Sequence, residues 1–486
     1  MATETLISHL AALPESRGWL YERVALRIGE LIEHGTLRPG ERIPSVRQLS
    51  RQEQLSIATV TQAYRVLENR GLIEARPQSG YYVRPRIWSQ PPEPAKSQPS
   101  PSATRVSVND LVMEVLQANH DPTLIVFGAA RPGTELLPTV QLNRTLASVA
   151  RRYPRESNTS DVPPGHLKLR TQIARRAMES GCTLAPDEIV VTCGCQEALN
   201  LCLRAVAKAG DTIAIESPTY YGILQIIESL GMKACEVPTF PRHGVCLDEL
   251  EKRLTRCKIK ACVFSPNFSN PLGSCMPDEK KQRLVELLAR RGIPLIEDDN
   301  GNLPHSGDRP KAAKAFDRQG MVLLCDSFTK TLAPGLRVGW TAPGRFQTRV
   351  EHLKFISTVG TGTLPQMAIA EFLANGGYDH HLRKLRRALA DQVRCATQAI
   401  AKYFPDGTKV TRPTGGHVLW VELPPRINSL ELFRRALAEK ISITPGPIFS
   451  PKQKYQNFIR LSCGDPWTEA LDQALRRLGE IMREMG

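Results

Sequence analysis

The sequence predicts an α/β protein made of a small helical head, a proline-rich linker and a large body in which strands and helices alternate. Three observations support this division. Apolar residues recur at helical spacing within residues 1–84, prolines crowd residues 85–105, and short apolar runs alternate with helical patterns over residues 106–486. The chain has 486 residues, whereas one domain usually has roughly 100–200, so we expect more than one core.

The head is predicted to form three helices and a hairpin. Apolar residues between positions 20 and 32 lie on one helical face. Ser45 is placed to cap a second helix, and Ser56 begins a third. Apolar residues at positions 72–73 and 81–83 then predict two strands of a hairpin, with its turn at residues 78–80. Three helices followed by such a hairpin form a winged helix-turn-helix.

A winged helix-turn-helix can bind DNA, and the third helix is then the recognition helix that enters the major groove. Short hydroxyl residues at its start can meet phosphates or base edges, and Arg47 is the strongest candidate contact. The predicted DNA contacts are Ser45, Arg47, Ser56, Thr59, Thr61, Arg65, Gln78, Ser79 and Gly80. A winged helix that binds another protein remains the alternative.

Net charge does not locate the DNA-binding surface. The chain carries +15, but residues 1–86 hold 12 Lys/Arg and 9 Asp/Glu, a balance of only +3. Most of the positive excess therefore lies in the body. A basic chain favours polyanionic partners without saying which surface meets them.

The linker, residues 85–105, holds six prolines among Ser, Gln, Lys and Glu. Such a segment cannot bury a core, and we expect it to be extended. At about 3.1 Å per residue its reach is on the order of 60 Å. The head could then lie far from its own body or cross to a partner subunit.

Targeting and metal-binding signals are not evident in the sequence. No apolar run of about 18 residues predicts a membrane span. The first residues do not have the pattern of a signal peptide. The 12 cysteines form no CxxC pair, which fits a reducing cytoplasm better than a disulfide or zinc framework. We therefore expect a cytoplasmic protein without a metal.

In the body, the alternation of strands and helices predicts a mostly parallel sheet. From about residue 380 this rhythm breaks, and a smaller α+β domain is expected over residues 380–486. The predicted strands of the large sheet are Ile189–Thr192, Thr212–Ile215, Ala261–Phe264, Leu295–Ile296, Val322–Cys325 and Val338–Thr341.

One motif carries the most chemistry: Ser327-Phe-Thr-Lys330-Thr-Leu-Ala-Pro-Gly-Leu-Arg337, directly after a predicted strand. A lysine in this position can form an imine with an aldehyde. The neighbouring hydroxyl and guanidinium can hold a phosphate. Together these groups suit pyridoxal 5'-phosphate (PLP), although an isolated lysine would more often be a surface residue.

Other motifs occur in a fixed order before this lysine: Gly194-Cys195-Gln196, Pro218-Thr-Tyr220, Asn270-Pro271 and Asp298-Asp299. With them, residues 106–486 resemble the fold-type I aminotransferases, which bind PLP. Residues 1–84 resemble the winged helices of the GntR family. The whole chain thus resembles the MocR-type (GabR-like) transcriptional regulators.

This resemblance implies a role for each motif residue. Lys330 matches the Schiff-base lysine, and Asp298 matches the carboxylate that pairs with the pyridinium nitrogen. Asn270 matches the partner of the phenolic oxygen, and Tyr220 the aromatic ring that stacks on the pyridine. Arg460 matches the arginine that forks onto a substrate carboxylate. Individually, each could instead be a turn or core residue.

The phosphate is expected at the turn between a strand and the next helix, because free N–H groups there favour anions. The implied phosphate-binding residues are Gly194, Cys195, Gln196, Ser327 and Arg337. On this interpretation Cys195 is a small loop residue and not a nucleophile.

Two tyrosines usual in the family are absent. None follows Asp298 within residues 298–302, and none is found in residues 160–165, the region that touches a neighbouring subunit's phosphate. These departures predict altered cofactor contacts and impaired turnover more than loss of PLP binding.

The resemblance implies a PLP-dependent DNA-binding transcriptional regulator that senses an amine or amino acid through aldimine chemistry. Its expected partners are a double-stranded DNA operator, the effector and a second copy of the chain, in a homodimer that could be domain-swapped. A working aminotransferase that acts on an amino acid and a 2-oxo acid is the alternative, and an assembly module is a third possibility.

Overall fold

The computed structural model describes residues 19–33, 36–37, 40–69, 72–76, 79–84, 90–119 and 121–485. It divides into two compact units, Met1–Ser89 and Gln90–Gly486, which we call the head and the body. In these described ranges, no helix combines the length and the apolar character that a bilayer crossing requires.

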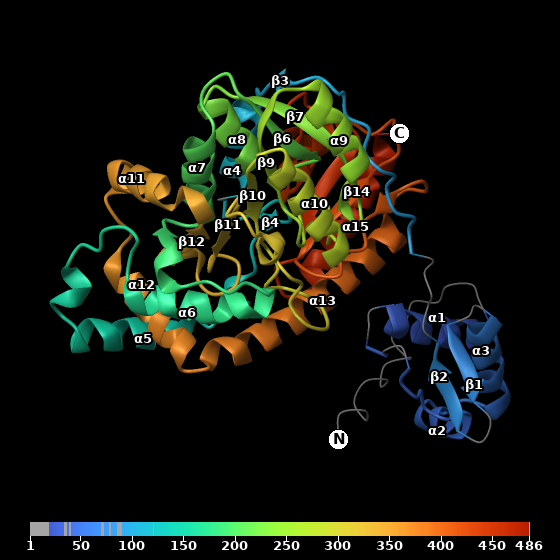
Figure 1. Ribbon diagram of the computed structural model, residues 1–486. Coiled ribbons are helices and arrows are strands. Elements are labelled where there is room, and N and C mark those ends of the chain that lie inside the picture. Colours follow the sequence, from blue (N-terminus) through green and yellow to red (C-terminus); the bar gives the residue numbers. More distant parts are fainter. Residues whose placement is uncertain are drawn as a thin grey trace. The chain divides into compact units, whose positions relative to one another are not determined.

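The head contains three helices and a two-stranded antiparallel sheet (Figure 1). They are α1 (Leu20–Glu33), α2 (Val46–Gln52), α3 (Ile57–Asn69), β1 (Ile73–Arg76) and β2 (Gly80–Val83). One face of each helix packs into a shared core that includes Val24, Leu49 and Tyr64. The predicted winged helix-turn-helix is confirmed.

Side-chain caps and one buried hydroxyl fix the helix starts. The Ser45 hydroxyl accepts a hydrogen bond from the Gln48 N–H at 3.2 Å and caps α2. The buried Tyr64 hydroxyl donates to the carbonyl of Pro44 at 2.7 Å, which ties α3 to the residue preceding that cap. The relative placement of α2 and α3 is therefore set by polar contacts as well as by the core.

The centre of the body is a nine-stranded sheet with the order β3-β7-β6-β9-β10-β11-β12-β5, and β8 pairs with β7. Strands β7, β6, β9, β10 and β11 run parallel, whereas β3 and β12 run antiparallel to their neighbours. The predicted α/β body is confirmed; the direction of β12 is not predictable from its apolar run. The strands are β3 (Thr104–Arg105), β5 (Val190–Thr192), β6 (Thr212–Ser217), β7 (Lys233–Phe240), β8 (Gly244–Val245), β9 (Ile259–Phe264), β10 (Leu295–Asp298), β11 (Val322–Ser327) and β12 (Gly339–Ala342).

Both faces of this sheet are buried, which explains its continuous apolar strands. Ile213 and Ile215 of β6 pack with residues of α7 and α8, while Ala214 between them packs with residues of α9 and α10. Helix α12 packs against α5, α6 and α13. The helices are α4 (Asn109–Ala118), α5 (Thr139–Arg152), α6 (Leu167–Ala177), α7 (Cys195–Val206), α8 (Tyr221–Ser229), α9 (Leu247–Arg256), α10 (Asp278–Arg290), α11 (Gln347–Thr358), α12 (Thr363–Ala374) and α13 (Gly377–Tyr403). We call this sheet and helices α4–α12 the large lobe.

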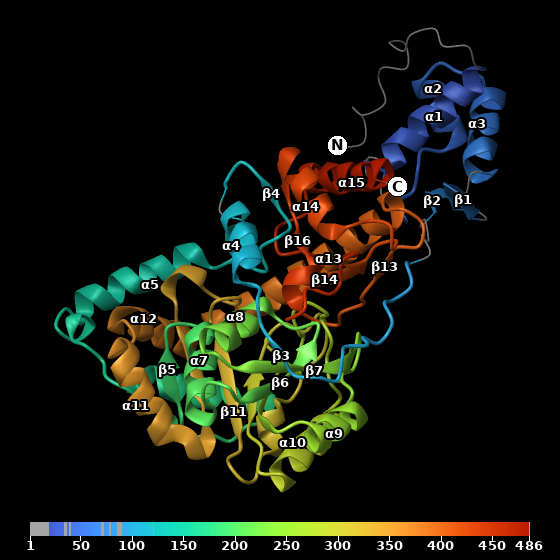
Figure 2. The same cartoon turned by 90° about the horizontal axis from the view of Figure 1, so that it is seen from above.

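A second, antiparallel sheet with the order β13-β14-β17-β16 forms the small lobe with α14 and α15, and a short parallel pair joins β4 and β15 (Figure 2). The long helix α13 packs on α12 at one end and on α15 at the other. The elements are β4 (Ile125–Val126), β13 (Lys409–Val410), β14 (Val418–Glu422), β15 (Ile441–Ser442), β16 (Thr444–Pro445), β17 (Phe458–Ser462), α14 (Ser429–Ala438) and α15 (Glu469–Glu484).

Residues 90–103, which we call the strap, have no regular secondary structure but lie against the body. Figure 2 shows this segment passing β13 before it reaches β3. Its carbonyls accept hydrogen bonds from the body, for example from the guanidinium of Arg253 to Pro99 at 3.3 Å and to Ser100 at 3.2 Å. Residues 90–103 of the linker predicted over residues 85–105 are therefore irregular in structure but held against the body. A proline-rich backbone lacks N–H donors but keeps its acceptors, and composition does not reveal what donates to them.

Candidate functional site

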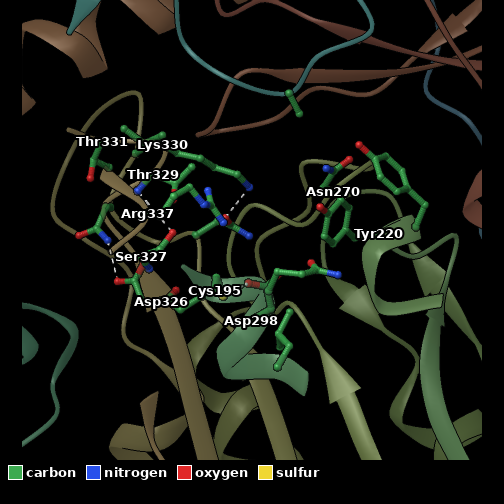
Figure 3. A pocket seen from close by; sticks show the side chains of 18 residues that line it. Cys195, Tyr220, Asn270, Asp298, Asp326, Ser327, Thr329, Lys330, Thr331 and Arg337 are labelled. Atoms are coloured by element: carbon green, nitrogen blue, oxygen red, sulfur yellow. Dashed lines mark hydrogen bonds between the residues drawn. The ribbon is translucent and has the colours of Figure 1, made fainter. Parts of the chain in front are cut away.

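Lys330 lies in the loop after β11 and extends into a cavity of about 180 Å³ (Figure 3). Its Nζ donates a hydrogen bond to Oδ1 of Asn300 at 2.8 Å. The cavity is formed where β10 and β11 end, and the carboxyl ends of parallel strands are where α/β sheets usually bind ligands. A primary amine thus points into a space bounded by polar loops.

The floor of the cavity contains a buried carboxylate. Asp298 ends β10 and is 8% exposed. Its two oxygens accept hydrogen bonds from the thiol of Cys195 at 3.3 Å and the hydroxyl of Ser265 at 3.4 Å. Burial raises the pKa of Asp298, and the nearby charge of Lys330 opposes this rise. Such a carboxylate is suited to pair with a basic nitrogen inside the cavity.

One end of the cavity can hold an anion. Gly194, between β5 and α7, has φ 80°, and a Cβ built on it would lie 2.4 Å from Nη2 of Arg337. The guanidinium therefore lies against the start of α7, whose first N–H groups lack helical partners. Ser327 at the end of β11 lines this end. The hydroxyl of Thr329 is buried without a hydrogen-bond partner among the described residues, so it is free to donate to a bound group.

The opposite side of the cavity carries aromatic and amide groups (Figure 3). Tyr220 precedes α8, and its ring lies 4.8 Å from that of Tyr221. Asn270 lines the same side, and its Oδ1 accepts a hydrogen bond from Nη1 of Arg460 at 3.5 Å. Gln196 also lines the cavity, but its amide donates to the carbonyl of Gly222 at 3.0 Å.

Arg460 comes from the small lobe, on β17, and is completely buried. Its Nη2 donates to the hydroxyl of Thr444 at 2.8 Å and to the carbonyl of Gly128. Its Nε is buried without a partner in the described part of the chain. Burial destabilises the charged guanidinium and so lowers its pKa. An anion beside it would offset this destabilisation. Arg460 does not itself line the cavity, but it contacts it through its hydrogen bond to Asn270, which does.

A buried ion cluster supports the cavity from below. Arg309 pairs with Asp299 at 2.6 Å and with Asp326 at 3.5 Å. Burial raises the pKa of Asp326 to about 7, although Arg309 opposes the rise. Asp299 is therefore occupied by Arg309, whereas Asp298 remains directed at the cavity.

Sequence reasoning missed Asn300, Thr329 and the Asp299–Arg309 pair. Asn300 lies two residues after Asp298, in the stretch where the expected tyrosine is absent. Its bond to Lys330 joins residues 30 positions apart, which no local pattern reveals. Thr329 lies inside the lysine motif, between Ser327 and Lys330, and only this position in the motif could have indicated a role in the site.

The structure places most predicted DNA-contacting residues on one helix and its approach. The hydroxyls of Ser56 and Thr59 lie 2.8 Å apart at the start of α3, whereas that of Thr61 donates to the carbonyl of Ile57 at 2.7 Å. The side chains of Arg47 and Arg65 are exposed.

At the hairpin, the Ser79 hydroxyl lies 2.6 Å from that of Tyr82, and Gly80 has φ 111°. Gln78 lies outside the described residues. Among the predicted DNA contacts, Arg47 and Arg65 are therefore exposed, and Ser56 and Thr59 lie at the start of α3.

Two protein-family models match the chain. The model for aminotransferase class I and II matches residues 140–478, and the model for bacterial regulatory proteins of the gntR family matches residues 20–83. The second match covers the winged helix-turn-helix. The first covers the residues of the cavity described above, apart from Ala130 at its edge.

Relatives of nearly full length share this combination. The chain is 40% identical to the uncharacterized HTH-type transcriptional regulator YdcR of Escherichia coli, over 96% of this chain and 99% of that protein. It is 28% identical to the HTH-type transcriptional regulator NorG of Staphylococcus aureus, over 91% and 100%. The body is also similar to a solved structure of LysN, the α-aminoadipate aminotransferase of Thermus thermophilus, with 27% identity and a TM-score of 0.71 over 77% of this chain and 94% of that one. The LysN structure contains N-(5'-phosphopyridoxyl)-L-leucine.

The residues of the cavity fit the same cofactor. Lys330 offers an amine to an aldehyde, Asp298 a buried carboxylate to a ring nitrogen, and Arg337 a cation to a phosphate. The close approach of Gly194 to Arg337 leaves no room for a larger residue at that end. PLP is thus the expected cofactor. The chain belongs to the class I and II aminotransferase family and, with its gntR-type head, is a transcriptional regulator of the MocR type.

Proposed function

We propose that this regulator binds PLP at Lys330 and senses an amine or amino acid there, and that it acts as a homodimer on operator DNA in the cytoplasm. The observation that supports this most strongly is the convergence of Lys330, Asp298 and Arg337 on one cavity in a chain that also carries a DNA-binding head. The dimer follows from the aminotransferase fold and the location from the DNA partner.

Each cavity residue has a proposed task. Lys330 attaches the cofactor, Asp298 pairs with its ring nitrogen, and the ring of Tyr220 covers one face. Thr329 and Arg337, with Ser327 and the start of α7, hold the phosphate. When bound, PLP supplies an aldehyde carbon that exchanges one amine for another and a ring that withdraws electrons.

The effector is proposed to carry a carboxylate as well as an amine. Arg460 is buried, its Nε has no partner among the described residues, and a guanidinium prefers a carboxylate as a fork-shaped partner. Asn270, bonded to Arg460, would keep the guanidinium oriented. An effector held in this way spans the two lobes, because Lys330 follows β11 of the large lobe and Arg460 lies on β17 of the small lobe.

Asn300 favours sensing over turnover. Its amide accepts a hydrogen bond from Lys330, but an amide does not ionise near neutral pH, whereas a phenol in this position can exchange a proton. Asn300 therefore positions the lysine amine but cannot exchange a proton with it. We expect amine exchange at Lys330 to be retained and proton shuttling to be slow.

The proposal is tested by DNA binding in the presence of defined ligands. Operator affinity is measured by band shift on the DNA upstream of the gene, without PLP, with PLP, and with PLP plus each of L-alanine, L-leucine, L-glutamate and β-alanine. We expect at least one amine to change the affinity of the wild-type protein and none to change that of Lys330→Ala. Equal effects on both proteins would show that the amines act elsewhere.

A working aminotransferase is the second candidate. The chain keeps the residues that the resemblance assigns to transamination, which are Lys330, Asp298, Asn270 and Arg460. In addition, an aromatic-amino-acid aminotransferase of Thermococcus litoralis is 28% identical over 77% of this chain. Product formation from an amino acid and a 2-oxo acid separates the two functions. Many turnovers per site would favour the enzyme, and one product per site the sensor.

A further inference from the structure

The strap is bonded to both lobes through one carboxylate. Glu93 pairs with Arg242, which follows β7 in the large lobe. Its other oxygen accepts a hydrogen bond from the backbone N–H of Arg412, which follows β13 in the small lobe, at 3.2 Å. The Glu93 side chain is only 17% exposed, so it lies between the strap and the body. The two interactions of the Glu93 side chain therefore depend on the spacing of the two lobes.

On the small-lobe side, a short chain of contacts leads from the strap to Arg460, which is bonded to Asn270 at the edge of the cavity. The carbonyl of Pro92 accepts from the Val410 N–H at 2.9 Å. The next residue, Thr411, exchanges two bonds of 3.0 Å with the backbone of Trp420. Trp420 lies opposite Arg460 in the β14–β17 register. A shift of Arg460 with its sheet therefore displaces the donors that hold Pro92.

On the large-lobe side, the strap is bonded to the strand that neighbours β6. The Ser97 N–H donates to the Thr239 carbonyl at 3.2 Å, and the Thr239 N–H donates to the Ser97 hydroxyl at 2.9 Å. The Thr239 hydroxyl accepts from the Ser217 N–H at 3.2 Å. Ser217 ends β6 three residues before Tyr220, which lines the cavity. This anchor belongs to the large lobe, although the hydroxyl of Ser217 also lies 2.7 Å from that of Tyr455 in the small lobe.

We propose that the strap transmits effector binding to the head, and that Glu93 is the residue that reads the position of the lobes. This inference rests on the proposed function. An effector held by Lys330 and Arg460 favours one spacing of the lobes. Glu93 cannot keep both Arg242 and Arg412 when that spacing changes. Effector binding then releases the strap from the small lobe while Ser97 stays anchored.

Release of the strap lengthens the tether of the head. The first bonded residue of the strap is Pro91, whose carbonyl accepts from the Arg412 guanidinium at 3.1 Å, and the seven Cα–Cα steps from Arg84 to Pro91 span at most about 25 Å. After release from the small lobe the next anchor is Glu93 on Arg242, and nine steps span at most about 32 Å; if that ion pair is lost as well, the next anchor is Ser97, and thirteen steps span at most about 45 Å. Two heads of a dimer on longer tethers reach more widely separated half-sites, and their effective concentration at a close pair falls.

Hydrogen exchange tests the release directly. The full-length protein is compared with PLP alone and with N-(5'-phosphopyridoxyl)-L-leucine, which joins the cofactor to an amino-acid carboxylate. We expect the amides of Val410 and Arg412, which donate to the strap, to exchange faster with the conjugate, while that of Thr239 is unchanged. Equal or slower exchange at Val410 and Arg412 in the bound protein would refute the proposal. Failure of the conjugate to bind would instead refute the assignment of Arg460, and the strap proposal would fall with it.

Two variants test whether the strap carries the signal to DNA. Glu93→Gln and Arg242→Gln break the same ion pair from opposite sides, and Arg242 is half-exposed, so its loss should not impair folding. Glu431→Gln, which breaks an exposed pair with Arg435 on α14, is the matched control. Operator affinity is measured for each protein with PLP and with the conjugate.

In the wild type we expect the conjugate to change operator affinity by a factor between about 5 and 150. In Glu93→Gln and Arg242→Gln this factor should fall to within about twofold of one, while the control keeps the wild-type value. Retention of the full factor in both strap variants would refute the inference. A wild-type factor of one would refute the proposed function, and exchange at Val410 would then decide by itself whether the strap responds.

Discussion

Replacing Gly194 with alanine tests the anion-binding end of the cavity. Gly194 has φ 80° and ψ 172°, a conformation that is essentially confined to glycine and costs other residues about 1–3 kcal/mol. The added Cβ would also lie 2.4 Å from Nη2 of Arg337, so the guanidinium must move. Losing one charge-assisted hydrogen bond of about 1.5–3 kcal/mol should weaken PLP binding roughly 10- to 150-fold.

The assay is a titration of the protein with PLP, followed by visible absorbance, together with thermal unfolding. Gly210→Ala is the matched control, because Gly210 also has a positive φ of 86°, but a Cβ added there would meet no described atom within 4 Å. Both variants should lose stability, and only Gly194→Ala should lose PLP affinity. Wild-type PLP affinity in Gly194→Ala would show that Arg337 and the start of α7 do not hold the phosphate.

Three further perturbations test the rest of the molecule. Lys330→Ala should abolish the borohydride-trapped PLP adduct found by mass analysis, with DNA binding of the effector-free protein retained; an adduct on another lysine would contradict this. Arg47→Ala should weaken operator binding by about 1–3 kcal/mol, or roughly 5- to 150-fold, without changing the cofactor spectrum. Unchanged affinity would remove Arg47 from the interface. Burial raises the pKa of Glu216 to about 8, so this carboxyl is protonated in the fold but ionised in the unfolded chain above its ordinary value of 4.5. Stability should therefore fall as pH rises from about 5 to about 8, and Glu216→Gln should flatten that fall in urea unfolding; an unchanged pH slope would exclude Glu216 as its source.

The parts of the fold and site that could be predicted depend on local sequence. Asp298 and Ser327 end strands, and Gly194 stands between a strand and a helix. Parallel strands bring such positions to one edge of a sheet. The roles of these residues, however, were implied by the resemblance to the fold-type I aminotransferases and not by the strand pattern alone. The head was predictable for a similar reason, because its caps and apolar spacing lie within a few residues of each other.

The parts that could not be predicted depend on distant partners. The hydrogen bond between Asn300 and Lys330, and the burial of Arg309 between two carboxylates, arise only when separate loops meet. The strap is the clearest case. Its composition is that of a free linker, yet donors from residues such as Arg253 and Val410, far along the chain, hold its carbonyls.

Helix α13 has a consequence for how the body comes apart. Its first half, with Leu382 and Leu389, packs into one apolar cluster, and its second half, with Ala396 and Ile400, packs into another. At about 1.5 Å per residue its 27 residues form a helix of roughly 40 Å, and both clusters include residues of this helix. If either cluster unfolds, α13 loses part of its packing, and the other cluster is destabilised with it. The body should therefore denature in one cooperative step.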